Sequence, residues 1–368
     1  MSAAVHNNDS TGSERIASLD GLRAISILLV IVGHLFGRSG AIADERARIF
    51  SKTAHFGVEV FFVISGFLIT TLLLNERTRS GTTDLLAFYM RRSLRIIPPL
   101  LVFMVAIVVA SQLGWIHTTR ADVVHALTYT TNYQFDPSWP LGHLWSLSVE
   151  EQFYLLWPLL FLRLSYRGAI IAALAMFAAA PLVRAVMHLL IHHDTYRDLP
   201  IFPAVADAIA AGCLVALLRP WLLAWSTYLR FTNSPALLWL LLPTVVVNMF
   251  DGYTLVNLFG GPLVLASVAV LMEACTRKHT GPAGRLLNSR PLVFVGLISY
   301  SLYLWQQPFM NPRGHAAINV FPLNVALAVA CALLSYFVVE RPLMALRRRW
   351  RERPRRCASA TNTIVEAP

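Results

Sequence analysis

The sequence predicts an all-α fold, a polytopic bundle of about ten transmembrane helices. Of the 368 residues, 56% are hydrophobic and only 14% are charged, whereas an ordinary soluble protein has about 25% charged residues. The mean hydropathy is +0.56. Apolar stretches of about 16 to 22 residues recur along the chain, and this is the length that crosses about 30 Å of hydrocarbon. A soluble fold of this length could not bury so much apolar surface.

Clusters of Gly, Pro, Asn and Arg separate these stretches, as expected for residues that end helices. The cluster Asn311-Pro312-Arg313-Gly314 is an example. On this basis we place the spans at approximately 22–37, 56–74, 99–116, 146–162, 168–190, 201–218, 236–250, 255–274, 291–310 and 318–340.

The distribution of Lys and Arg predicts the orientation, because basic residues accumulate on the cytoplasmic side of a membrane. Most of them fall in alternate connecting segments, and the loop between the first two spans is the exception. We therefore expect both termini in the cytoplasm and the protein in the cell membrane. The chain divides into a polar N-terminal segment, 1–18, a membrane domain, 19–343, and a basic, disordered tail, 344–368.

The net charge of +11 is compatible with nucleic-acid binding. However, the strongest basic cluster, between Arg347 and Arg356, directly follows the last span and suits anionic lipid headgroups better. The four cysteines are far apart, so neither a disulfide framework nor a zinc site is predicted. The group His192-His193-Asp194 is more simply a solvated loop than a metal site. We expect no nucleic-acid partner and no metal.

Arg23 and His34 are the most informative pair in the first span. Eleven helical residues make about three turns, so both side chains share one face and lie about 16 Å apart along the axis. Arg23 should then lie near the cytoplasmic surface and His34 near mid-depth. Titratable side chains in hydrocarbon cost about 3 kcal/mol or more each and usually serve a function. His34 is therefore a candidate catalytic base.

A basic patch leads into the third span from the cytoplasmic side, in the sequence FYMRRSLRIIPPL from Phe88. Arg92 and Arg95 are three residues apart and so are neighbours on one helical face, with Arg91 beside them. Guanidinium groups in this arrangement suit phosphate oxygens. From spacing alone, three ordinary positive-inside anchors explain the patch equally well.

Two adjacent glutamates, Glu150 and Glu151, enter the fourth span from outside. Their side chains diverge by about 100°, so at most one can face a given cavity. Glu150 is about 19 Å from the inner end of the span at Arg163, close to the depth expected for His34. It is a candidate to orient the imidazole and to stabilise its charged form. The alternative is that both glutamates are interfacial and hydrated.

Other polar and aromatic residues lie within the spans. Ser65 and the glycine after it fall midway through the second span, where small residues usually allow close helix packing, although Ser65 is also a candidate substrate contact. Arg184 and Asp207 lie six residues inside the outer ends of consecutive spans and could form a structural ion pair. Trp145 and Tyr154 are either packing residues or substrate contacts.

Six segments occur in a characteristic order: LDGLR from Leu19 with His34 after it, GVEVFFVISGFLIT from Gly57, FYMRRSLRIIPPL from Phe88, LWSLSVEEQFYLLWP from Leu144, ISYSLYLW from Ile298 and VERP from Val339. With these segments the chain resembles the acyltransferase-3 family of integral membrane acyltransferases over about residues 19–343. Each segment is a weak signal, but six in order are specific.

The resemblance implies transfer of an acyl group, commonly acetyl from cytoplasmic acetyl-CoA, to a hydroxyl of a sugar-containing acceptor such as a cell-surface glycan, a glycolipid or a macrolide. Acetyl-CoA or another acyl-CoA is then a co-substrate, and no permanently bound cofactor is expected. The family's Arg and His motif matches Arg23 and His34, its paired-arginine motif matches Arg92 and Arg95, and Glu150 falls on its acidic position.

We therefore expect the coenzyme A phosphates on Arg92, Arg95 and Arg91, with Arg23 guiding the pantetheine arm toward His34. His34 acts either as general base or as a transient acyl carrier. Substrate contacts are expected from three further side chains, namely Ser65, Trp145 and Tyr154. Catalysis should be complete within the bundle.

Two positions depart from the family pattern. Gln306 follows Tyr303-Leu304-Trp305 where the family often has a histidine, so we expect no proton-handling role for the ninth span. Glu59 replaces what is often an aspartate or an apolar residue, a change that the sequence does not explain.

A transporter or flippase of a lipid-linked sugar is the alternative function, because a polytopic bundle with buried charged residues could move a substrate without bond chemistry. The pair Arg92 and Arg95 favours the enzyme, since a phosphate-binding arrangement has no evident use in proton coupling.

Overall fold

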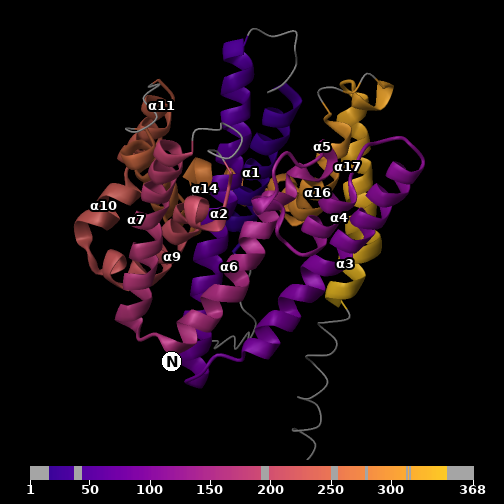
Figure 1. Ribbon diagram of the computed structural model, residues 1–368. Coiled ribbons are helices and arrows are strands. Elements are labelled where there is room, and N and C mark those ends of the chain that lie inside the picture. The colour runs from indigo at the N-terminus through magenta and orange to yellow at the C-terminus, as the bar shows by residue number, and fades with distance from the viewer. Residues whose placement is uncertain are drawn as a thin grey trace, which may run out of the picture.

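The computed structural model describes residues 16–36, 44–191, 199–249, 256–277, 281–311, 314 and 316–345. In this part of the chain all regular structure is helical (Figure 1). The helices are, in order, α1 Ala17–Phe36, α2 Asp44–Ser80, α3 Leu85–Gln112, α4 Arg120–Leu127, η1 Thr131–Tyr133, α5 Trp139–Gly142, α6 Leu144–Arg163, α7 Tyr166–Leu190, α9 Phe202–Ala224, α10 Ser226–Asn233, η2 Pro235–Leu241, α11 Leu242–Met249, η3 Val256–Gly260, α13 Gly261–Arg277, α14 Gly281–Leu287, α15 Arg290–Leu297, α16 Ser299–Phe309, η4 Ala317–Asn319, α17 Leu323–Ser335 and η5 Tyr336–Glu340.

The all-α prediction is confirmed for these residues. Seven helical segments are long and apolar enough to cross a membrane, and each coincides with a predicted span: α1, α2 from Lys52, α3, α7, α9, Leu258–Arg277 and Leu323–Ala345. The predicted N-terminal segment and basic tail fall almost entirely before residue 16 and after residue 345, outside the described residues. The same is true of the group His192-His193-Asp194.

The other three predicted spans fall on helices that do not meet the same criterion, for identifiable reasons. Helix α6 is 20 residues long but carries two glutamates and several other polar side chains. The span predicted at 236–250 is divided between η2 and α11. The span predicted at 291–310 is interrupted at Ile298, which ends α15 and precedes α16. The total of ten spans and the cytoplasmic termini stay predictions.

Helices α1 and α2 lie at the centre of the bundle (Figure 1). The 37 residues of α2 extend over about 55 Å, so this helix is longer than a bilayer is thick. It crosses α9 where Gly66 faces Gly212: a Cβ atom on Gly66 would overlap the carbonyl oxygen of Ile209, and one on Gly212 would overlap that of Val63. The predicted packing role of the small residues near Ser65 is therefore confirmed.

Helix α3 begins well before the predicted third span. Asp84 caps it by accepting a hydrogen bond from the Ala87 N–H at 2.9 Å. The helix then continues through Pro98 and Pro99, although each lacks a backbone donor. Because α3 is already helical from Leu85, the arginines of the basic patch project from its first turns as predicted.

The predicted ion pair inside the membrane domain is confirmed. Arg184 on α7 donates to Asp207 on α9 at 2.7 Å, and it also donates to the Ala204 carbonyl. Asp207 is buried. The pair joins two helices in the apolar part of the bundle and serves packing there.

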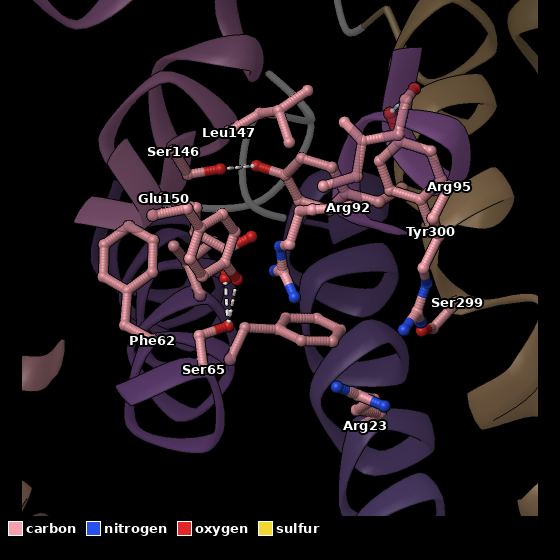
Figure 2. Close-up of a pocket in the computed structure, with 15 residues that line it drawn as sticks. Arg23, Phe62, Ser65, Arg92, Arg95, Ser146, Leu147, Glu150, Ser299 and Tyr300 are labelled. Atoms are coloured by element: carbon pink, nitrogen blue, oxygen red, sulfur yellow. Dashed lines mark hydrogen bonds between the residues drawn. The ribbon is translucent and has the colours of Figure 1, made fainter. Parts of the chain in front are cut away.

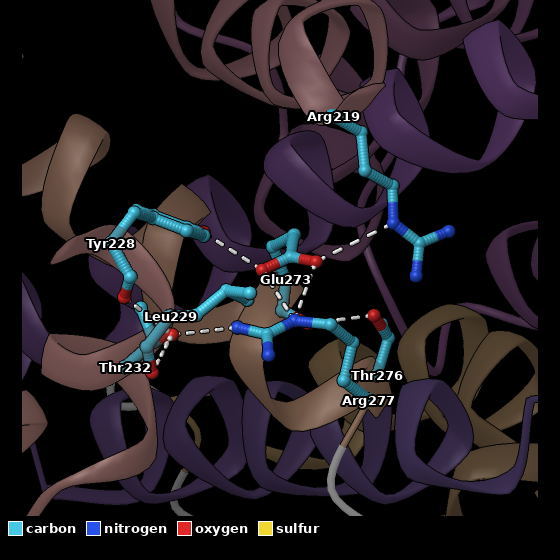
Figure 3. A network of polar contacts seen from close by, with 7 residues as sticks. All are labelled: Arg219, Tyr228, Leu229, Thr232, Glu273, Thr276 and Arg277. Carbon is cyan, nitrogen blue, oxygen red and sulfur yellow. Dashed lines mark hydrogen bonds and ion pairs between the residues drawn. The ribbon is translucent and has the colours of Figure 1, made fainter. Parts of the chain in front are cut away.

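A second buried ionic group holds α9, α10 and α13 together (Figure 3). Glu273 on α13 is fully buried and accepts hydrogen bonds from Arg277 at 2.9 and 3.0 Å and from the Tyr228 hydroxyl at 2.7 Å. Arg219 on α9 approaches the same carboxylate at 3.4 Å, and Arg277 also donates to Thr232. One carboxylate therefore satisfies donors from three helices.

We predict that Glu273→Ala lowers the free energy of unfolding by about 3–5 kcal/mol, because breaking a buried ion pair leaves uncompensated charge in the interior. Glu76→Ala is the matched control, since Glu76 is half-buried and lies 3.8 Å from Arg91, and it should cost about 1 kcal/mol or less. Denaturant or thermal unfolding of the purified protein in detergent measures both. Equal effects of the two substitutions would contradict the assignment.

Candidate functional site

Three arginines converge on one cavity, here called the arginine cavity, which has about 710 Å³ of empty volume, including space open to the outside (Figure 2). Four elements supply most of its wall: α1, α2, α3 and α6, with α16 closing it. The lining residues are Arg23, Val58, Phe61, Phe62, Ser65, Arg92, Arg95, Ile96, Ser146, Leu147, Glu150, Tyr154, Ser299, Tyr300 and Tyr303.

The three guanidinium groups are held in different ways. Arg92 lies over the ring of Tyr154, with 3.3 Å between the guanidinium carbon and the ring centroid. Arg23 is 3.4 Å from Asp20, one turn earlier on α1. Among the described residues, Arg95 makes no hydrogen bond or ion pair. The predicted shared face of Arg92 and Arg95 is confirmed, and the cavity presents more positive than negative charge to a ligand.

Glu150 lies in this cavity, as Figure 2 shows, and accepts a hydrogen bond from the Ser65 hydroxyl at 2.5 Å. Tyr154 in turn donates to the Ser65 oxygen at 2.8 Å. Ser65 and Tyr154, predicted substrate contacts, are thus on the cavity wall. The predicted role of Glu150 as orienter of His34 is not supported by the geometry, because Glu150 accepts its hydrogen bond from Ser65 and lines a cavity that His34 does not line.

Arg91 does not line the arginine cavity. It lies 3.8 Å from Glu76 near the end of α2, on another side of α3. The three arginines of the patch therefore do not form one fork in space, because Arg91 and Arg92, as neighbouring helical residues, diverge by about 100°.

His34 lines a second cavity, here called the histidine cavity, which has about 770 Å³ of empty volume, including space open to the outside. It is lined by Gly33, His34, Ala54, His55, Val58, Trp139, Gly142, His143, Trp145, Tyr303 and Gln307. His34 sits in the last turn of α1. Its depth in the membrane stays a prediction.

The imidazole of His34 is held by α16 and α5. Its Nδ1 lies 2.8 Å from the Oε1 of Gln306, and the edge of its ring meets Trp139 with 5.9 Å between centroids. Trp139 is itself fixed by two hydrogen bonds with Gln307: its indole N–H donates to the Gln307 carbonyl at 2.8 Å, and the Gln307 amide donates back at 2.6 Å. Trp145 stacks on His55 at 6.0 Å.

Val58 and Tyr303 line both cavities, which therefore adjoin. The Tyr303 hydroxyl donates to the His143 carbonyl at 2.8 Å and contacts Ser146. The tyrosine ring is thus held in the wall between the arginines and His34. Tyr303 and Val58 therefore lie where the two cavities meet.

Sequence reasoning missed three contributors: Trp139, Tyr303 and Gln306. In the sequence, Gln306 stands out only as a departure from the family pattern. That departure did mark a site position, because Gln306 contacts His34. Tyr303 and Trp139 carried no comparable signal, since an aromatic residue in such a chain is usually a packing residue.

The segment that carries Trp139 is anchored by Asp122. This carboxylate completes a capping box with Thr119 on α4, and it also accepts from the Gln134 amide at 2.5 Å and the Ser138 N–H at 3.2 Å. Burial raises the pKa of Asp122, but the hydrogen bonds from Thr119 and Ser138 outweigh burial and hold the pKa below its ordinary value. One carboxylate therefore ties α4 to the residue before Trp139.

Comparison with known proteins gives a consistent result. A family profile described as an acyltransferase domain matches residues 16–341. O-acetyltransferase OatA of Staphylococcus aureus is 29% identical over 356 residues, which cover 89% of this chain and 57% of that protein. YrhL of Bacillus subtilis is 30% identical over 364 residues, covering 89% of this chain and 55% of YrhL.

Peptidoglycan O-acetyltransferase OatA of Listeria monocytogenes is 28% identical over 362 residues, which cover 89% of this chain and 56% of that protein. The chain thus spans little more than half the length of these relatives. No solved structure matches the chain at a significant level.

We predict that Asp122→Asn loosens the segment 119–139 at neutral pH by about 1 kcal/mol, because charge-assisted hydrogen bonds are lost. A lowered folded-state pKa contributes stability above the ordinary carboxyl pKa, and this stability is lost as pH falls through the folded value. The difference from wild type should therefore disappear in acid. Amide hydrogen exchange at several pH values measures it.

Asp136→Asn is the matched control for Asp122, since Asp136 is exposed in the same segment and has a φ of 47°, which Asn also tolerates. Its exchange should match wild type at every pH. A pH-independent effect of Asp122→Asn would contradict the linkage.

Proposed function

Because the chain belongs to the acyltransferase-3 family, whose domain covers residues 16–341, we propose that it transfers an acyl group, most simply acetyl from cytoplasmic acetyl-CoA, to a hydroxyl of a sugar-containing acceptor. The proposal rests chiefly on one observation: a cavity with three arginines adjoins a cavity that contains a histidine. An anionic donor and a neutral acceptor would then meet from two sides.

The arginine cavity suits the donor. Coenzyme A carries phosphates, and guanidinium groups bind phosphate oxygens through charge-assisted hydrogen bonds. Arg92 and Arg95 would hold these phosphates, and Arg23 would complete the site. Glu150 balances part of this positive charge and fixes Ser65. Because Arg23 and His34 are about 16 Å apart along α1, the pantetheine arm would extend past Tyr303 to bring the thioester to His34.

The histidine cavity suits the acceptor. An acceptor hydroxyl would give its proton to His34 as its oxygen attacks the thioester carbonyl carbon, so that a C–O bond forms and the C–S bond breaks. The proton then passes from His34 to the departing thiolate of coenzyme A. This direct route needs donor and acceptor bound together, whereas an acyl-histidine intermediate would give ping-pong kinetics.

The acceptor class is supported by the aromatic residues and by the relatives. Trp139 and Trp145 give the histidine cavity flat apolar walls between polar groups, a surface on which the apolar face of a sugar ring can lie. All three relatives are named as O-acetyltransferases: OatA of Listeria monocytogenes as a peptidoglycan O-acetyltransferase, and YrhL as a putative one. We therefore propose a glycan or glycolipid hydroxyl as acceptor and the cell membrane as the location.

We predict that membranes containing the protein move radiolabel from [acetyl-¹⁴C]acetyl-CoA into a glycan, lipid or small-molecule fraction, and that His34→Ala lowers the rate by about 100- to 10,000-fold, the usual contribution of a general base. Thermal unfolding of purified His34→Ala confirms that the fold is kept. Sugar movement without label transfer would favour the transporter, and native transfer by His34→Ala would overturn the role of His34.

We predict that Arg95→Gln raises the KM for acetyl-CoA by about 10- to 100-fold, since each hydrogen bond to a charged group contributes about 1.5–3 kcal/mol. Arg91→Gln is the matched control on the same helix, because Arg91 lies outside the cavity, and its KM should stay within about twofold of wild type. Steady-state kinetics in detergent or nanodiscs measures both. Equal effects would place the donor phosphates elsewhere.

A further inference from the structure

We propose that Gln306 is a positioning residue that fixes His34 in the tautomer required of the base. The inference rests on the proposed function for the role of His34, but the hydrogen bond itself can be tested without activity. Gln306 lies 272 positions from His34 in sequence, on α16, and is fully buried.

The chemistry of the contact selects one tautomer. The Gln306 Oε1 lies 2.8 Å from the His34 Nδ1, and a carboxamide oxygen can only accept a hydrogen bond. Nδ1 therefore carries the hydrogen, and the lone pair of the neutral ring is on Nε2. A general base must present that lone pair to the acceptor hydroxyl. Gln306 thus decides which ring nitrogen can take the proton.

The Gln306 side chain makes no second hydrogen bond with any described residue. Its Nε2 is buried and finds no partner among the described residues, so the bond to His34 is the polar contact that orients the amide. The next residue, Gln307, holds Trp139 against the same imidazole. One turn of α16 therefore orients both the base and its aromatic neighbour.

An amide differs in one respect from the histidine that often follows this motif in the family. It carries no proton that titrates, so it orients His34 without changing the charge of the cavity as pH changes. The titratable groups that face His34 from the surrounding elements are His55 on α2, His143 before α6 and Tyr303 on α16. A carboxylate at position 306 would add a charge that stabilises protonated His34.

Three variants and two readouts test the proposal in the full-length protein. Gln306→Met keeps the length of the side chain without the acceptor and should lower kcat by about 10- to 100-fold, the usual effect of losing a partner that orients a functional histidine. Gln306→Glu keeps the acceptor and should retain activity, with the acidic limb of the kcat/KM profile moved up by about one pH unit or more. Gln306→His should add a second titrating limb.

Nitrogen NMR of ¹⁵N-histidine-labelled protein in nanodiscs is the activity-independent readout. Assigned by comparison with His34→Ala, the His34 signal should show the Nδ1–H tautomer in wild type and lose that preference in Gln306→Met. An unchanged tautomer, or a native rate and pH profile in Gln306→Met, would overturn the inference. Absence of transfer by the wild-type protein, with the NMR result as expected, would instead overturn the proposed function and leave the hydrogen bond established.

Discussion

The convergence of three partly exposed guanidinium groups on one cavity is the constraint on which the rest of the molecule depends. Charged groups inside an apolar bundle are costly, so each needs nearby polar groups or a ligand. Arg92 finds the face of Tyr154, and Arg23 has Asp20. Arg95 makes no hydrogen bond or ion pair with any described residue. The positive charge of the cavity is therefore best balanced when an anion occupies it. The surrounding helices place polar residues along the cavity wall.

Helix α1 connects the two cavities. Arg23 lines the arginine cavity and His34 lines the histidine cavity, and a rigid helix keeps them about 16 Å apart. Close packing holds α1 in place: a Cβ atom on Gly33 would come within 2.5 Å of the Ala54 nitrogen on α2. The ten residues between Arg23 and His34 therefore set the distance between the two cavities. The close packing of α1 against α2 keeps this distance fixed.

Local patterns predicted the features that depend on one helix or on two consecutive helices. These include the position of most spans, the shared face of Arg92 and Arg95, and the pair of Arg184 and Asp207. Features that depend on helix ends or on distant segments were missed or misplaced. The span predicted at 291–310 is interrupted at Ile298, which its apolar composition did not reveal. Glu150 was matched to His34 by estimated depth, but it contacts Ser65, about ten residues further along α2 than His55, which lines the cavity of His34.

The break at Ile298 explains why α16 departs from an ordinary membrane span. A short helix need not be apolar on all sides, and α16 places polar residues three or four apart, which puts them along one face. Tyr300 lines the arginine cavity, Tyr303 lines both, and Gln307 lines the histidine cavity. This face runs alongside both sites, as Arg23 and His34 do on α1. Two helices distant in sequence thus supply parallel rows of polar groups, and the low apolar content of α16 follows from the site that it lines.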